Sequence, residues 1–124
     1  MAHATVLLVE DVRLAADYYR DKLGFEVTYF EANPRHYAYA SRGDVHVHFA
    51  CFKDARPAPN AEAAPPDMFD IYVYVEDVEA LYDELAERGA TLLHEPTDQA
   101  YGLREFRVRD PHGYILAFGE LLQA

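Results

Sequence analysis

The sequence predicts an α+β fold built from two βαβββ modules, and two observations carry this prediction. The tetrapeptide Val-Glu-Asp-Val occupies residues 9–12 and occurs again at residues 75–78. Around each copy the same kinds of segment follow in the same order: an apolar strand-like run, a capping aspartate, an amphipathic helix, a glycine and further strands. Two copies of one unit therefore describe the 124 residues better than a long repeat array.

The two predicted helices are marked at both ends. Asp11 and Asp77 stand where the carboxylate of an N-cap residue accepts the free amide protons of the first turn. Gly24 and Gly89 stand where a left-handed C-cap is needed. Between these residues the apolar positions recur with the i, i+3, i+4, i+7 spacing of an amphipathic helix.

The predicted strands are short runs rich in β-branched and aromatic residues, separated by glycine and proline turns. They cover residues 5–9, 25–30, 37–40, 45–52, 71–75, 91–94, 104–108 and 114–118. Residues 54–67 contain four prolines, at positions 57, 59, 65 and 66, and are expected to form an extended, exposed linker. The prediction is thus one domain over residues 1–124, with a first module at 1–53 and a second at 68–124.

Alternation along the strands assigns side chains to faces of the predicted sheet. His46 and His48 share one face, opposite the valines and the phenylalanine of their strand. Asp70, Tyr72 and Tyr74 likewise lie opposite the aliphatic residues of theirs. The aliphatic faces should pack under the helices, so the polar and aromatic faces must meet water or a pocket.

Composition narrows the classes of function. Eleven basic and 22 acidic residues give a net charge of −11, which disfavours nucleic-acid binding and favours cationic or neutral ligands. Ten tyrosines and no tryptophan suit a ligand site that offers flat apolar surface with hydroxyl groups. The single cysteine, Cys51, excludes an intrachain disulfide and is expected to face a helix and be inert. Without a basic leader or a long apolar run, a cytoplasmic location is expected and membrane association is not.

Several stretches together resemble the vicinal oxygen chelate superfamily, which includes glyoxalases, bleomycin-resistance proteins and extradiol dioxygenases. They are residues 7–12 (LLVEDV), 16–25 (ADYYRDKLGF), 101–102 (YG) and 108–114 (VRDPHGY). The resemblance covers nearly the whole chain and agrees with the internal repeat. It implies that the two modules pair and that their sheets curl into a cup, as an eight-stranded mixed sheet.

Many members of that family bind a divalent metal in the cup through one residue from each of four strands. The resemblance places those positions at Ala4, His48, Asp70 and Ala117. The methyl groups of Ala4 and Ala117 cannot bind an ion, and His48 and Asp70 alone are too few ligands for a catalytic metal. The sequence therefore predicts no cofactor, with His48 and Asp70 as the weak metal candidates.

The missing ligands favour the metal-free branch of the family, which resembles the bleomycin-resistance proteins. That similarity implies a homodimer that sequesters an aromatic or cationic compound, as in antibiotic resistance, with no catalytic residue. A partly open cup also leaves strand edges for a partner to cover. One alternative is a metal-dependent enzyme, such as a glyoxalase-type lyase, an epimerase or a dioxygenase, with Glu105 or Glu120 as base. Another is a protein without a small-molecule site, its cup filled by packed tyrosines.

The predicted ligand-binding residues combine the polar faces of the strands with nearby aromatic and basic side chains. They are His46, His48, Asp70, Tyr72, Tyr74, Tyr101 and Arg107, together with Tyr37 and Tyr39.

Overall fold

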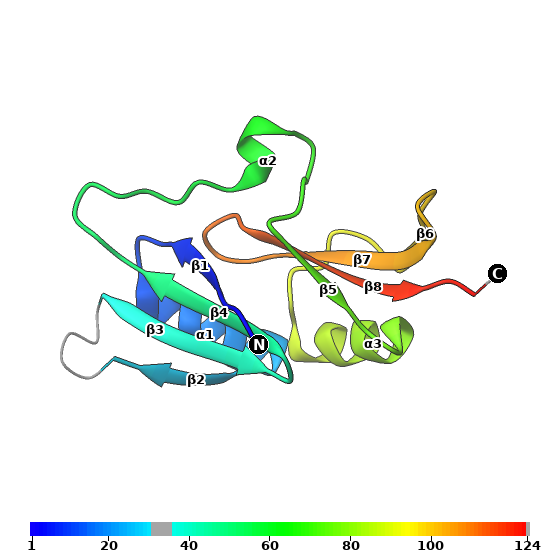
Figure 1. Ribbon diagram of the computed structural model, residues 1–124, viewed down its shortest axis with the longest axis horizontal. Helices are drawn as coiled ribbons and strands as arrows, with labels where there is room; N and C mark the ends of the chain where they lie inside the picture. The colour runs from blue at the N-terminus through cyan, green and yellow to red at the C-terminus, as the bar shows by residue number, and fades with distance from the viewer. Residues whose placement is uncertain (31–35, 124) are drawn as a thin grey trace. The chain divides into compact units, whose positions relative to one another are not determined.

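The computed structural model describes residues 1–30 and 36–123. Its strands and helices confirm the α+β class, and the eight strands form two mixed four-stranded sheets (Figure 1). The chain divides into two compact units, which are described separately. The first comprises Met1–Ala58 with Pro111–Gly113, and the second comprises Pro59–Asp110 with Tyr114–Ala124.

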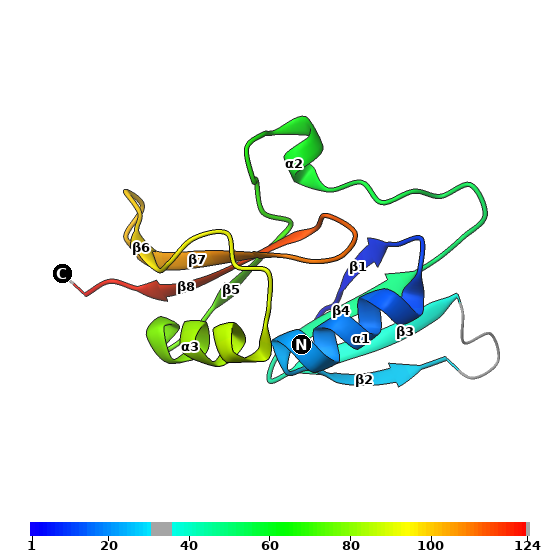
Figure 2. The same cartoon turned by 180° about the vertical axis from the view of Figure 1, so that it is seen from behind.

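The first unit holds one helix and one sheet with the strand order β1-β4-β3-β2. Its elements are β1 (Thr5–Leu8), α1 (Val12–Leu23), β2 (Glu26–Tyr29), β3 (Tyr37–Arg42) and β4 (Val45–Ala50). Strand β1 runs parallel to β4, and the other pairs are antiparallel. Helix α1 crosses one face of this sheet, as the rear view in Figure 2 shows.

The second unit repeats this arrangement with the strand order β5-β8-β7-β6. Its elements are α2 (Asn60–Ala63), β5 (Ile71–Tyr74), α3 (Val78–Arg88), β6 (Thr97–Asp98), β7 (Leu103–Arg109) and β8 (Ile115–Leu121). Strand β5 runs parallel to β8, as β1 does to β4. The βαβββ order predicted from the repeated tetrapeptide is therefore present in both halves.

Both long helices have the predicted caps. The side chains of Asp11 and Asp77 each accept a hydrogen bond at 3.0 Å, from Leu14 N and Ala80 N respectively. Gly24 and Gly89 close the helices with φ of 75° and 84°, the left-handed region that favours glycine.

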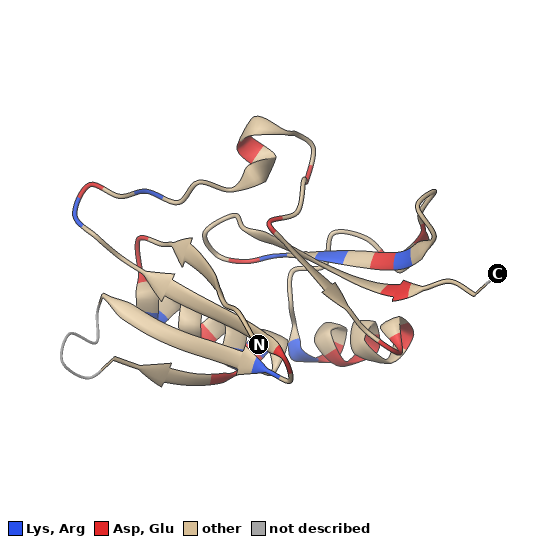
Figure 3. Ribbon diagram, in the orientation of Figure 1, with Lys and Arg blue, Asp and Glu red and all other residues tan. Residues whose placement is uncertain are grey.

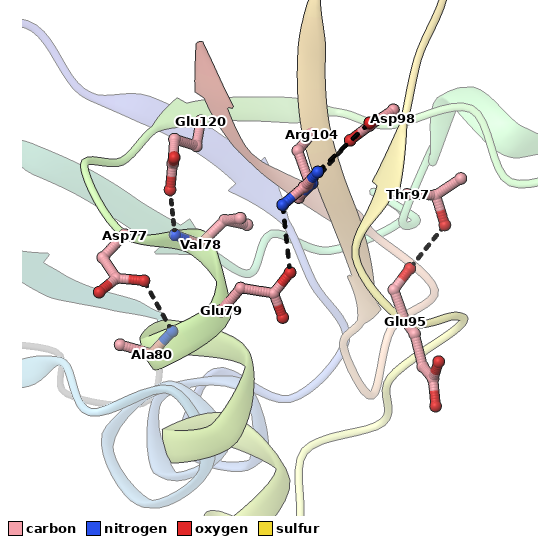
Figure 4. Close-up of polar contacts among 9 residues, drawn as sticks. All are labelled: Asp77, Val78, Glu79, Ala80, Glu95, Thr97, Asp98, Arg104 and Glu120. Carbon is pink, nitrogen blue, oxygen red and sulfur yellow. Dashed lines mark hydrogen bonds and ion pairs between the residues drawn. The ribbon is translucent and has the colours of Figure 1, made fainter. Parts of the chain in front are cut away.

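Helix α3 is also tied to strands of its own sheet. Figure 4 shows Glu120 of β8 accepting a hydrogen bond from Val78 N at 2.9 Å. In the same view Arg104 of β7 lies between Glu79 of α3, at 3.7 Å, and Asp98 of β6, at 2.6 Å. These contacts hold the first turn of α3 and the short edge strand β6 beside β7 and β8.

The core of each unit lies between its helix and one face of its sheet, as the alternation predicts. In the first unit Tyr19 of α1 packs on Phe49 of β4 with ring centroids 4.7 Å apart. In the second, Tyr82 of α3 packs on Phe106 of β7 at 5.3 Å. The opposite faces, here called the free faces, carry the polar and aromatic side chains.

Charge is distributed differently over the two sheets (Figure 3). Strands β1 and β4, with the sequences TVLL and VHVHFA, carry no Lys, Arg, Asp or Glu. Strand β7, with the sequence LREFRVR, carries a glutamate among three arginines. Among the described residues, the only charged strand residues of the first sheet are Glu26 of β2 and Arg42 of β3, whereas the second sheet carries four on β7 and one each on β6 and β8.

Three local predictions need correction. Residues 91–94 form only an isolated bridge between Leu92 and Val108. The chain bends there because His94 and Thr97 both hydrogen-bond to the Glu95 carbonyl and Pro96 has no N–H to donate. Figure 4 shows the contact between Thr97 and Glu95.

The other two corrections concern the end of β4 and the linker. Strand β4 ends at Ala50, so the alternation no longer applies to Cys51, which is half-buried with its Sγ 3.5 Å from the Glu10 carbonyl. The predicted extended linker contains the short helix α2. Among the described residues, no helix is long and apolar enough to cross a membrane.

Candidate functional site

The free face of the first sheet carries a pocket of about 440 Å³. It is lined by Phe30, His36, Tyr37, Tyr39, His48 and Phe52. Tyr39 and His48 are direct cross-strand partners on β3 and β4, and their rings are 4.8 Å apart. The hydroxyl of Tyr37 lies within hydrogen-bond distance of His48 Nδ1, at 3.0 Å. This pocket combines flat aromatic surface with one polar pair.

The free face of the second sheet carries a pocket of about 300 Å³. It is lined by Phe69, Tyr72, Tyr74, Tyr101 and Leu103. Tyr72 and Tyr74 come from β5, where alternation places both on the side away from the helix. Their ring centroids are 5.3 Å apart, and Tyr72 also meets Phe69 at 5.1 Å.

A buried carboxylate lies behind this second pocket. Glu105 has no exposed surface, and its Oε1 accepts hydrogen bonds from the hydroxyls of Tyr72, at 2.9 Å, and Tyr101. Its Oε2 accepts one from Arg107 Nε at 2.8 Å. Arg107 in turn donates to the carbonyl oxygen of Asp67 at 2.8 Å, so the charged pair is fixed from several sides.

These contacts set the protonation of the cluster. Burial acts to raise the pKa of Glu105, but the hydrogen bonds from Tyr101, Arg107 and Tyr72 outweigh it and leave the pKa lowered. Burial and the hydrogen bond to Glu105 raise the pKa of Tyr72 and of Tyr101. The arrangement is thus an anionic carboxylate held by neutral phenols and a cationic guanidinium.

The absence of a side chain at Gly119 leaves room for the ring of Tyr72. A Cβ at position 119 would lie 2.2 Å from the Tyr72 hydroxyl oxygen and 2.8 Å from its Cζ. Gly119 pairs with both Tyr74 and Glu105 in the sheet, so it lies on the free face beneath the pocket. The glycine therefore sets how closely Tyr72 approaches β8 and Glu105.

The structure places six of the nine predicted ligand-binding residues in the two pockets. Tyr37, Tyr39 and His48 line the first, and Tyr72, Tyr74 and Tyr101 line the second. Tyrosine packing within each sheet does not fill either pocket, although Tyr37 and Tyr39 lie 5.4 Å apart.

The other three predicted residues have different surroundings. Arg107 contacts the second pocket indirectly, through Glu105 and through the ring of Phe69, over which its guanidinium carbon lies at 5.1 Å. His46 pairs with Ser41 in the sheet and lines neither of these two pockets. Asp70 accepts backbone hydrogen bonds from Asn60 N at 2.7 Å and Ile115 N at 2.9 Å, which gives it a structural role. The nine ligand-binding assignments stay predictions.

Sequence reasoning did not place several pocket residues. Phe30, His36, Phe52 and Phe69 lie at or beyond strand ends, where alternation no longer assigns a face. Alternation along β7 could have placed Glu105 on the same face as the predicted residue Arg107. Nothing in the sequence, however, shows that the hydroxyls of two tyrosines meet at its carboxylate.

The metal positions implied by the family resemblance do not fit a metal ion. Ala4 and Ala117 present methyl groups, and both carboxylate oxygens of Asp70 already accept backbone hydrogen bonds. Within residues 1–30 and 36–123, no group of three His, Cys, Asp or Glu side chains is placed to hold a metal. The absence of a cofactor stays a prediction, since it concerns the protein in solution.

Comparisons with known proteins agree with this fold. The Bacillus subtilis (strain 168) protein YraH is 25% identical over 122 residues, which cover 94% of each chain. The bleomycin-binding protein of bleomycin-producing Streptomyces verticillus, solved with copper(II)-bleomycin, is 26% identical with a TM-score of 0.72, over 100% of this chain and 97% of its own. The lactoylglutathione lyase of Agrobacterium tumefaciens shares the fold, at 19% identity and a TM-score of 0.71, over 97% of this chain and 92% of its own.

Proteins of this fold thus include a binding protein and an enzyme, so the fold alone does not select between the two. The model of the Glyoxalase family, described as the Glyoxalase/Bleomycin resistance protein/Dioxygenase superfamily, matches residues 1–118. This chain therefore belongs to the glyoxalase/bleomycin resistance protein/dioxygenase superfamily.

Proposed function

We propose that this protein binds a small aromatic or cationic compound on the free faces of its sheets and sequesters it without a metal and without chemical change. The observation that carries the proposal is the pocket of about 440 Å³ on the first sheet, whose lining is aromatic and histidine side chains. Its size is within the range of small-molecule sites. Stacking on Tyr39 and His48 favours a planar ligand, and the Tyr37 hydroxyl offers one directional hydrogen bond.

Charge and ancestry support the same class of ligand. The net charge of −11 favours the approach of cations over anions. The Streptomyces verticillus relative binds bleomycin, and its likeness extends over all of this chain. Antibiotic resistance by sequestration is accordingly the biological role that we propose. The donor set favours this role over a metal-dependent one, because two of the four ligand positions are alanines.

We also propose that the protein acts as a homodimer in the cytoplasm. Apolar side chains remain exposed on strand β1, where Val6 is 53% and Leu8 36% exposed. A second copy of the chain would cover such surfaces. Mass measurement by light scattering is expected to give twice the monomer mass of 14.1 kDa, and a monomer at micromolar concentration would contradict this part of the proposal.

The test of ligand binding uses calorimetric titration with metal-free bleomycin, copper(II)-bleomycin and a panel of planar aromatic cations. Saturable binding of at least one compound is expected, with Tyr39→Ala weakening it about tenfold through loss of stacking. Leu14→Ala, an exposed position on α1 outside both pockets, is the matched control and should leave affinity unchanged. Turnover of any compound, or equal effects of the two variants, would contradict the proposal.

A further inference from the structure

Four aromatic rings surround the pocket of the second sheet. Phe69, Tyr72, Tyr74 and Tyr101 line it with Leu103, and none of these described side chains carries a charge. Neighbouring rings are close, with centroids 5.1 Å apart for Phe69 and Tyr72 and 5.3 Å for Tyr72 and Tyr74. The faces of such rings are negative and attract a cation placed within about 6 Å. The arrangement suits a positive group surrounded by aromatic walls.

Two of these rings are made more electron-rich by their hydrogen bonds. The hydroxyls of Tyr72 and Tyr101 both donate to Oε1 of the buried Glu105 carboxylate. A phenol that donates to an anion gains some phenolate character, because hydrogen-bonded groups polarise one another. Its ring face then attracts a cation more strongly than that of an isolated tyrosine.

The same cluster already holds one cation of the protein itself. The guanidinium carbon of Arg107 lies 5.1 Å from the centre of the Phe69 ring. Its charge is balanced by Glu105, with Nε and Oε2 2.8 Å apart. The balance reduces repulsion between Arg107 and a second cation in the pocket.

The hydrogen bonding of Glu105 also selects between kinds of cation. Its carboxylate is fully buried, and both of its oxygens already accept hydrogen bonds. A primary ammonium entering the pocket would lose water without gaining a carboxylate acceptor for its N–H groups. A quaternary ammonium has no N–H groups to satisfy, so ring faces alone can stabilise it.

We propose that the pocket lined by Phe69, Tyr72, Tyr74, Tyr101 and Leu103 binds a quaternary or fully methylated ammonium group. This inference rests on the proposed function, since it names the chemistry of a cationic group that the second sheet recognises. Tyr74 is 76% exposed and Tyr101 54%, so the pocket is open on one side. A methylated ammonium at the end of a larger molecule can therefore enter while the rest of the molecule stays outside.

The test is a nuclear magnetic resonance titration of the full chain with three probes, of which the second matches the first in shape and the third matches it in charge without the methyl groups. They are choline, its neutral isostere 3,3-dimethyl-1-butanol, and the primary amine ethanolamine. Choline is expected to bind saturably with shifts at Gly119 and the pocket tyrosines, and about tenfold more tightly than either other probe. Equal affinity for the neutral isostere or for ethanolamine, or no binding of choline, would overturn the inference.

Two variants locate the site. Tyr74→Leu removes an exposed ring wall and is expected to weaken choline binding several-fold while leaving the neutral isostere unchanged. Gly119→Ala keeps every ring but displaces Tyr72 from Glu105, and should also weaken choline binding. Tyr39→Leu, which alters the pocket of the other sheet, is the matched control and should have no effect.

The results separate this inference from the proposed function. If choline fails to bind but an aromatic compound still binds in a Tyr39-dependent way, only the inference is overturned. If choline binds and no aromatic compound does, the role of the first pocket is overturned and the ammonium site stands. Choline binding that depends on Tyr39 and not on Tyr74 would overturn the ammonium site.

Discussion

At the scale of single residues, the environment of Glu105 decides what the second pocket can do. A carboxylate without exposed surface would ordinarily be costly, because burial removes it from water. Here two phenols and a guanidinium replace the lost water, so the charge is retained and both oxygens are used. The negative charge therefore reaches the pocket through the polarised rings of Tyr72 and Tyr101 rather than by direct contact with a ligand.

Replacing this carboxylate by an amide tests the arrangement. Glu105→Gln keeps the shape but leaves Arg107, whose side chain is 19% exposed, without its anion. Removing one partner of a buried ion pair is expected to lower the unfolding free energy by about 3 kcal/mol. Urea denaturation of Glu105→Gln and of the wild type measures this loss. Glu87→Gln, an exposed position on α3, is the control and should change stability by less than about 0.5 kcal/mol. Equal costs for the two variants would contradict the buried pair.

The same carboxylate predicts how stability responds to acid. Because the pKa of Glu105 is lowered in the folded chain, its contribution is complete above its unfolded pKa of about 4.3. That contribution is lost as the pH falls through the lower, folded pKa. Unfolding free energy measured between pH 6 and about pH 3 should therefore fall less steeply in Glu105→Gln than in the wild type. Parallel curves would show that other carboxylates account for the acid response.

At the scale of elements, the two copies of the repeat are most alike at the N-termini of their helices. Asp11 and Asp77 occupy equivalent places after β1 and β5 and make the same hydrogen bond at the same length. Short polar caps depend on neighbouring residues only, so they can be predicted from the sequence. Residues 91–94 show the limit, because their expected strand was replaced by a bend that depends on Pro96 and on hydrogen bonds to Glu95.

The equivalence of the caps makes a paired prediction. Asp11→Ala and Asp77→Ala should each lower the unfolding free energy by about 1 kcal/mol, because each leaves first-turn amides without an acceptor. Asp11→Asn and Asp77→Asn should restore most of the loss, since asparagine also accepts this hydrogen bond. Chemical denaturation of the four variants provides the measurement. An alanine variant as stable as its asparagine counterpart would contradict the capping role at that position.

At the scale of the whole molecule, the sequence predicts the fold well and the candidate site only in part. The repeated tetrapeptide, the caps and the alternation are local signals, and they lead to two βαβββ units and to the correct facing of His48, Tyr72 and Tyr74. The role of Glu105 depends on side chains 33 and four residues away in the chain, and no local pattern reports such a convergence. Asp70 is the opposite case: a candidate ligand-binding residue on the predicted face instead accepts hydrogen bonds from two backbone amides.

A contact between distant parts of the chain gives the last prediction. Within the first unit, which includes Pro111–Gly113, Asp11 N donates to His112 Nε2 at 3.2 Å. Burial lowers the pKa of His112, although the nearby charges of Asp11 and Glu10 act to raise it. The folded chain therefore takes up this proton less readily than the unfolded chain does. Protonation of Nε2 would also remove the acceptor that Asp11 N uses.

Stability should consequently decrease as the pH falls below about 6.5, the ordinary pKa of histidine, by at most about 1.4 kcal/mol per pH unit for one proton. Urea denaturation of the wild type and of His112→Ala between pH 7.5 and about pH 5.5 should show a shallower slope in the variant. His3→Ala, at an exposed position, serves as control and should keep the slope of the wild type. If His112→Ala also keeps the slope of the wild type, the folded chain does not hold His112 neutral, because only a histidine held neutral by folding makes stability depend on this proton. The contact would then not link the 111–113 turn to the start of α1 in the way that the geometry indicates.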